Sequence, residues 1–106
     1  MNEKSKEFQE LCKEYDAISQ ILIELKKAKS KWPDWLFDPI HASSILCEEA
    51  GETLQAANDF CYSNGDIERL RIEAAQTGAM AIRLLENLDK YERVRTYINQ
   101  ENKVEK

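Results

Sequence analysis

The sequence predicts an all-α protein built from three long helices. Only three glycines and two prolines occur in 106 residues, and no segment alternates apolar and polar residues as a half-buried strand does. Apolar residues instead recur three and four positions apart over long segments, which is typical of amphipathic helices. We therefore expect an antiparallel helical bundle of three long helices plus a short C-terminal helix, in one domain that spans residues 1–106.

The first predicted helix runs from about Ser5 to about Ala28. Its apolar residues form one stripe with spacings of three and four: Phe8, Leu11, Tyr15, Ile18, Leu22 and Leu25. The pattern resembles a heptad repeat, but it covers fewer than the three to four repeats that indicate a coiled coil. The amphipathic helix is therefore the firmer prediction.

An aromatic connection, KSKWPDWLFDPIH, separates this helix from the next. Asp38 followed by Pro39 is a good helix start, because the Asp side chain accepts hydrogen bonds from free amides and proline suits the first turn. The second helix should run from about Pro39 to about Tyr62. The sequence SNGD then ends it, because Asn64 and Gly65 tolerate the left-handed conformation.

The third helix should begin after Asp66, which can cap it, and run from about Ile67 to about Leu88. Beyond it, DKYERVRTYINQENKVEK has a weak apolar stripe of Tyr91, Val94 and Ile98. This stripe predicts a short fourth helix or a continuation of the third. The charged ends, residues 1–4 and 100–106, should be frayed.

The composition excludes several classes of function. Twenty acidic residues against 15 basic ones give a net charge of -5, and no basic block is present, which argues against nucleic-acid binding. No apolar stretch approaches the roughly 20 residues that span a bilayer, and the start, MNEKSKEFQE, has no signal-peptide core. We therefore expect no membrane contact and a cytoplasmic location.

Three cysteines, Cys12, Cys47 and Cys61, show no C-x-x-C spacing. They indicate neither a disulfide framework nor a zinc site. Ser43 and Ser44 lack a basic partner at a telling spacing, and no glycine-rich phosphate loop occurs. His41 is the single histidine and reads as a boundary residue. The absence of an E-x-x-H pair sets the ferritin-like di-iron bundles aside.

The stretch CEEAGETLQ places carboxylates on the apolar stripe of the second helix. At about 100° per residue, Glu52 falls about 20° to one side of Ile45 and Glu49 about 40° to the other. Glu48 lies at the edge of the stripe. An ionised carboxylate in an apolar environment is normally paired, protonated or bound to a cation. Oxygen ligands favour hard ions, here Mg²⁺, Mn²⁺ or Ca²⁺. The alternative is a helix rolled so that these acids reach solvent.

Two segments, EEAGE and LRIEAAQTGAMAIRLLENL, together resemble the MazG-like all-helical nucleotide pyrophosphohydrolases. Those proteins carry E-x-x-E on one helix and E-x-x-D on the next, and both hold Mg²⁺ at a nucleoside triphosphate. The likeness covers about residues 32–88. It maps Glu49 and Glu52 onto the first motif and Glu73 onto the second. Gln76 stands where the family usually has Asp and contributes no charge.

The resemblance implies Mg²⁺-dependent hydrolysis between the α- and β-phosphates of a nucleoside triphosphate, with Mn²⁺ as a possible substitute. The expected metal ligands are Glu49, Glu52, Glu73 and Gln76, and the expected catalytic residues are Glu48 and Glu49, either of which can act as the base for the attacking water. Candidate substrate-binding residues are Lys29, Lys31, Trp32, Trp35 and Arg83. For these five, the alternatives are solvated surface cations and an aromatic connection packed over the end of the bundle.

The third helix has a second face of small and apolar residues at Ala75, Ala79 and Ile82, apart from the stripe that contains Leu70 and Leu85. A helix with two such faces is covered on two sides, which predicts a homo-oligomer, a dimer or a tetramer as in the resembled family. The alternative is a helix buried centrally in one chain. Two rival functions are a non-catalytic interaction or nucleotide-sensing module on the same scaffold, and a heptad-driven adaptor built on residues 8–25.

Overall fold

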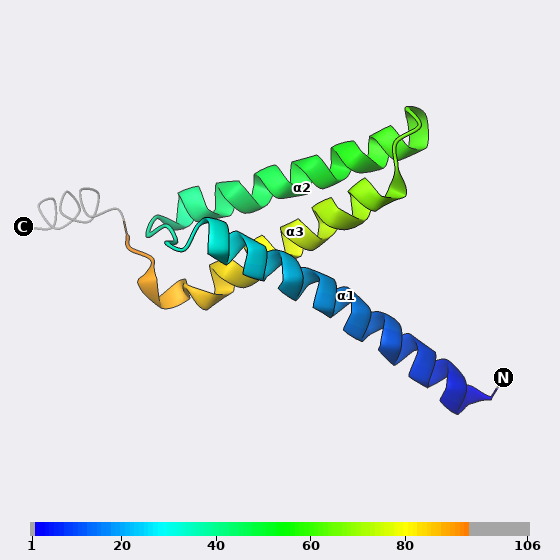
Figure 1. Ribbon diagram of the computed structural model, residues 1–106. Coiled ribbons are helices and arrows are strands. Elements are labelled where there is room, and N and C mark those ends of the chain that lie inside the picture. Colours follow the sequence, from blue (N-terminus) through cyan, green and yellow to red (C-terminus); the bar gives the residue numbers. More distant parts are fainter. Residues whose placement is uncertain (1, 94–106) are drawn as a thin grey trace, which may run out of the picture.

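The computed structural model describes residues 2–93, and all regular secondary structure in this range is helical (Figure 1). The helices are α1 (Glu3–Lys31), α2 (Pro39–Tyr62) and α3 (Ile67–Glu86), followed by a short 3₁₀ turn, η1 (Leu88–Lys90). Within these described residues there is no strand. The predicted all-α class is confirmed, and the predicted second helix has the observed bounds.

Local capping explains where the helices begin. Asp38 accepts a hydrogen bond from the Ile40 amide at 2.9 Å, and Asp66 accepts one from the Glu68 amide at 3.0 Å, as the sequence predicts. The side chain of Asn2 accepts from the Ser5 amide, so α1 begins at Glu3, earlier than Ser5. Between α2 and α3, Asn64 takes the left-handed conformation with φ of 60°.

The helices α2 and α3 form an antiparallel hairpin, and α1 packs across α3 while its N-terminal half extends away from the hairpin (Figure 1). In the described part of the chain, α1 does not pack against α2. Within the described residues, the structure therefore shows the three long helices, but the predicted antiparallel bundle arrangement is not confirmed. Because α3 lies between the other two helices, residues of all three helices line one cavity.

Small residues dominate the buried positions, which are Leu25, Ala42, Ala56, Ala75 and Ala79. Ala79 is fully buried and Leu85 is 63% exposed, so the chain does not cover the apolar stripe of α3 at Leu85. The small face is buried instead, because small side chains let neighbouring helices approach α3 closely. A Cβ at Gly78 would lie 2.9 Å from Cδ1 of Ile21 in α1.

This burial also changes the argument for an oligomer. Ala75 and Ala79 lie on the face that the sequence assigns to a second subunit, yet the chain itself covers both. The structure corresponds here to the alternative of a central helix. A second copy, if present, must use another surface, and the expectation of a homo-oligomer stays a prediction.

The third helix ends at Glu86, two residues before the predicted Leu88. Asn87 is buried, and its side-chain amide donates to the Arg83 carbonyl at 2.7 Å, which satisfies a carbonyl in the last turn of the helix. The Glu92 amide then donates to the Phe37 carbonyl at 3.0 Å. Most of the predicted C-terminal helix lies outside the described residues. Among the helices of residues 2–93, none is both long and apolar enough to cross a membrane.

Candidate metal and ligand site

Three carboxylates from two helices converge on one point. Glu49 and Glu52 lie one turn apart on α2, and Glu73 projects from the antiparallel α3. One oxygen from each lies within 4.8 Å of the other two. The sequence predicts that the first two share a helix face, and the packing of α2 against α3 adds the third.

The cluster is partly removed from water. Glu49 and Glu73 are half-buried and Glu52 is exposed. The Oε2 atoms of Glu49 and Glu73 are buried and have no hydrogen-bond partner among the described residues. A buried polar atom without a partner costs free energy, so these two atoms are the least satisfied part of the site.

Burial and like charge disturb the acidity of both half-buried residues. Desolvation raises the pKa of Glu49, and the charges of Glu52, Glu73 and Glu48 raise it further. Desolvation also raises the pKa of Glu73, followed by its hydrogen bond and charge interaction with Glu52, whereas Arg69 lowers it. The cluster therefore disfavours its own full ionisation.

The donor set fits a hard divalent cation. It consists of carboxylate oxygens alone, which suit Mg²⁺ or Mn²⁺. Two of these oxygens, Oε2 of Glu49 and Oε2 of Glu73, are buried and have no hydrogen-bond partner among the described residues. Arg69, whose charge lowers the pKa of Glu73, is already paired with Asp59 at 2.6 Å. Glu49, Glu52 and Glu73 are thus the residues that could hold such an ion.

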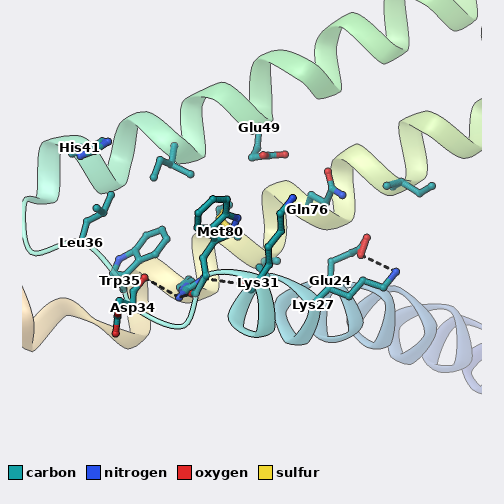
Figure 2. A pocket seen from close by; sticks show the side chains of 16 residues that line it. Glu24, Lys27, Lys31, Asp34, Trp35, Leu36, His41, Glu49, Gln76 and Met80 are labelled. Carbon is teal, nitrogen blue, oxygen red and sulfur yellow. Dashed lines mark hydrogen bonds and ion pairs between the residues drawn. The ribbon is translucent and has the colours of Figure 1, made fainter.

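A cavity of about 860 Å³ opens beside this cluster, between α1, α2, α3 and the connection that follows α1. Figure 2 shows Glu49 on the α2 wall, Gln76 and Met80 on α3, and Lys31 and Trp35 near the end of α1. Glu49 belongs both to the cavity wall and to the carboxylate cluster. A ligand in the cavity would therefore meet the cluster at this residue.

Four of the five predicted substrate-binding residues line the cavity: Lys31, Trp32, Trp35 and Arg83. Lys29 does not. Its Nζ lies 2.9 Å from the Glu86 carboxylate on the side of α1 that pairs with α3. Lys29 and Lys31 are two positions apart, so they cannot face the same direction on a helix. Of these two lysines, only Lys31 lines the cavity.

Arg83 is buried and lines the cavity, and its contacts are with the protein. Its Nη1 donates to the Ala28 carbonyl at 3.4 Å, and its Nη2 donates to the carbonyls of Trp32 and Asp34. The guanidinium lies 4.7 Å from the centre of the Trp35 ring. Burial lowers its pKa, but a guanidinium stays charged. Arg83 thus fastens the end of α1 and the following connection to α3.

Two predicted residues flank the cluster without joining it. Glu48 is exposed and lies outside both the cluster and the cavity lining, although its charge still acts on Glu49. Gln76 lines the cavity one turn after Glu73 and is half-buried. Their predicted roles, in catalysis and at the metal, stay predictions.

Sequence reasoning missed Glu24 and Lys27, which line the cavity from α1. Lys27 Nζ lies 3.5 Å from Glu24 Oε2 (Figure 2). The available signal was spacing: Lys27 and Lys31 are four residues apart, so they lie on one helix face. That signal alone does not tell which face meets a cavity.

Comparison with known proteins gives no assignment, because no family model, no curated protein and no solved structure matches this chain.

Proposed function

We propose that this protein is a Mg²⁺-dependent nucleoside triphosphate pyrophosphohydrolase with MazG-like character, which yields a nucleoside monophosphate and pyrophosphate. One observation carries the proposal. Two buried carboxylate oxygens without partners, on Glu49 and Glu73, converge with Glu52, and Glu49 also lines a large cavity. The sequence resemblance, which predicts these same three residues as ligands, supports the proposal independently of the geometry.

In this proposal, the residues divide the work by charge. The ion, when bound, would supply positive charge at the phosphates and so favour attack on phosphorus. Lys27 and Lys31 would add positive charge from the α1 side of the cavity. Glu48 or Glu49 would accept the proton of the attacking water. Gln76 offers a neutral oxygen from the α3 wall of the cavity.

The aromatic side chains of the connection suit a base, and they are not equivalent. Trp35 is engaged with Arg83 on its ring, and its Nε1 donates to the Tyr91 hydroxyl at 2.8 Å. Trp32 is exposed, and Lys31 Nζ lies 5.7 Å from its ring centre. Trp32 is therefore the better surface for stacking a nucleobase.

The test is release of pyrophosphate from the common ribo- and deoxyribonucleoside triphosphates, with and without Mg²⁺. We expect Glu49→Gln to lower the rate by about 100-fold or more, a loss typical of a residue at the reacting centre, with helix content retained. Glu10→Gln, on the exposed part of α1, is the control and should keep full activity. Full activity in Glu49→Gln would refute the assigned role.

The second candidate is a non-catalytic, nucleotide-sensing module, and Gln76 favours it. Relative to the resembled pattern, Gln76 removes one negative charge beside the cluster, which weakens cation binding. Such a module would be stabilised by Mg²⁺ and nucleotide without releasing pyrophosphate. In the enzyme, Gln76→Asp should raise Mg²⁺ affinity and activity together; in the module, affinity alone should rise.

A further inference from the structure

The apolar stripe of α1 lies mostly outside the fold of the chain. Every residue from 2 to 19 is exposed. Five residues of the stripe are each between 47 and 67% exposed: Phe8, Leu11, Tyr15, Ile18 and Leu22. Only Leu25, the last of the series, is buried. The chain thus has a heptad-spaced stripe that its own helices do not cover.

This half of α1 projects from the hairpin of α2 and α3 (Figure 1). A helical segment of this length is marginal in water without packing partners. An exposed series of large apolar side chains on one face marks an interaction surface. A second helix with the same spacing is the simplest cover, since knobs from one stripe fit holes of the other.

The charge distribution along α1 indicates which helix fits. Residues 3–17 contain five acidic residues against three lysines, a net charge of -2, whereas residues 18–31 contain one glutamate against four lysines, a net charge of +3. Two copies of α1 in antiparallel orientation place the acidic half of each beside the basic half of the other. A parallel pair would align like with like.

A hollow on α1 fits the same orientation. It measures about 330 Å³ and is lined by Leu22, Leu25, Lys26, Lys29 and Ser30. In an antiparallel pair with its axis between Tyr15 and Ile18, Phe8 of one copy lies opposite residues 22–25 of the other. Phe8, at the N-terminal end of the stripe in one copy, then lies opposite the hollow beside Leu22 and Leu25 in the other copy.

We propose that α1 is the seam of an antiparallel homodimer, in which Phe8 of each copy enters the hollow beside Leu22 and Leu25 of the other. This surface is separate from the carboxylate cluster, so a test of the dimer does not depend on whether the proposed activity is correct. The dimer covers the exposed stripe and pairs the charged halves of α1.

The first test is the molar mass in solution, measured by light scattering during size-exclusion chromatography. The wild-type protein should have twice the chain mass of 12.3 kDa. The double variant Phe8→Lys, Leu11→Asp should have the mass of one chain. Residues 2–19 are all exposed, so the two substitutions should leave the hairpin of α2 and α3 folded. An unchanged chemical denaturation curve for this hairpin checks that the variant is folded.

A matched control carries the same added charges on the opposite face of the helix, at Gln9→Lys and Ala17→Asp. This control should remain a dimer. A wild-type protein that stays monomeric at high micromolar concentration overturns the proposal. So does a double variant that remains dimeric.

The second test fixes the orientation, in protein whose Cys47 and Cys61 are replaced by Ser. In the antiparallel pair, Cys12 of one copy lies near Ser19 of the other, so Ser19→Cys should form a cross-linked dimer under a mild oxidant. Positions 12 and 19 of one helix are about 10 Å apart, too far to bridge within one chain. Cys12 alone should not cross-link. Efficient cross-linking through Cys12 alone indicates a parallel pair and refutes the proposed seam.

Discussion

The hydroxyls of Thr53 in α2 and Thr77 in α3 lie 2.9 Å apart and share a hydrogen bond at the level of the carboxylate cluster. Each oxygen is also 2.9 Å from the carbonyl oxygen four residues earlier, that of Glu49 or Glu73. The two hydroxyl protons are therefore shared among three contacts, one between the hydroxyls and one from each hydroxyl to a helix carbonyl. This bridge joins the turns that carry the acids, and so fixes the distance between them.

Replacing either threonine by valine should lower the free energy of unfolding by about 1 kcal/mol, the usual worth of one such hydrogen bond. The loss stays small because the remaining hydroxyl can still donate to its own helix carbonyl. The double variant should be no less stable than either single variant, since both partners of the bridge are then absent. Urea denaturation measures all three. Additive losses would show that the hydroxyls act separately.

Protein treated with a chelator should become more stable as the pH falls from neutral toward the ordinary glutamate pKa of 4.5. The folded pKa values of Glu49 and Glu73 are raised above the ordinary value of 4.5. Between the ordinary and the raised values, the folded chain binds more protons than the unfolded chain, so stability rises with falling pH and is lost as the pH rises through the folded pKa. Urea midpoints across this range measure the effect, and a Glu49→Gln, Glu73→Gln variant should show a smaller rise. An equal rise of the urea midpoint in both proteins would show that groups other than Glu49 and Glu73 cause it.

Glu49→Gln should raise the melting temperature in the absence of divalent ions, because it removes one charge from a repelling group. The same variant should lose most of the stabilisation by Mg²⁺, which for an intact site amounts to about 2.7 kcal/mol at an ion concentration 100 times Kd. Glu48→Gln lies outside the cluster and should keep the Mg²⁺ shift. A shift of equal size in all three proteins contradicts the predicted ligand set.

Arg83→Met should lower the free energy of unfolding by about 3 kcal/mol, because it removes a buried guanidinium that donates to three backbone carbonyls. Arg83→Lys keeps the charge but not the forked donors, and should lose an intermediate amount. Arg69→Met removes an exposed ion pair with Asp59 and serves as the control, with a loss below about 1 kcal/mol. Guanidinium denaturation checks the order of the three.

Gly78→Ala should be destabilising although alanine favours a helix, because the new Cβ would lie 2.9 Å from Ile21 and overpacking costs about 1–3 kcal/mol. Gly51→Ala is the matched control. No atom comes within 4 Å of a Cβ at Gly51 in the described structure, so this change should stabilise α2 by about 0.5–1 kcal/mol. Equal effects of the two changes would mean that α1 does not pack closely at Gly78.

Residues near one another in sequence account for the predictions that the structure confirms. Asp38 and Asp66 begin helices because their side chains reach amides two residues away, and such contacts form without the rest of the chain. The shared face of Glu49 and Glu52 follows from the helical repeat in the same way. The earlier start of α1 reflects the Asn2 cap, a signal of the same local kind.

The exposed side of α1 shows where such reasoning ends. Its stripe from Phe8 to Leu22 has the pattern of a core, and periodicity alone does not say whether the cover comes from the same chain. Lys29 and Lys31 are equally plausible ligands in the sequence, but only Lys31 lines the cavity. The way α1 packs against α3 determines which of the two lysines faces the cavity.

The sequence by itself determined the all-α class, the helix starts at Asp38 and Asp66, and the pair of acids on one face of α2. The helical repeat does not place Glu73 beside this pair; the sequence indicates it only through the resemblance, and the packing of α2 against α3 brings it there. Tertiary structure alone decided that Ala75 and Ala79 are buried in place of Leu85, and that Arg83 is engaged by backbone carbonyls. The physical reason is that the helical repeat fixes the angles between side chains on one helix. The rotation of each helix about its axis, and the angle at which it crosses its neighbour, depend on the packing of side chains from distant segments.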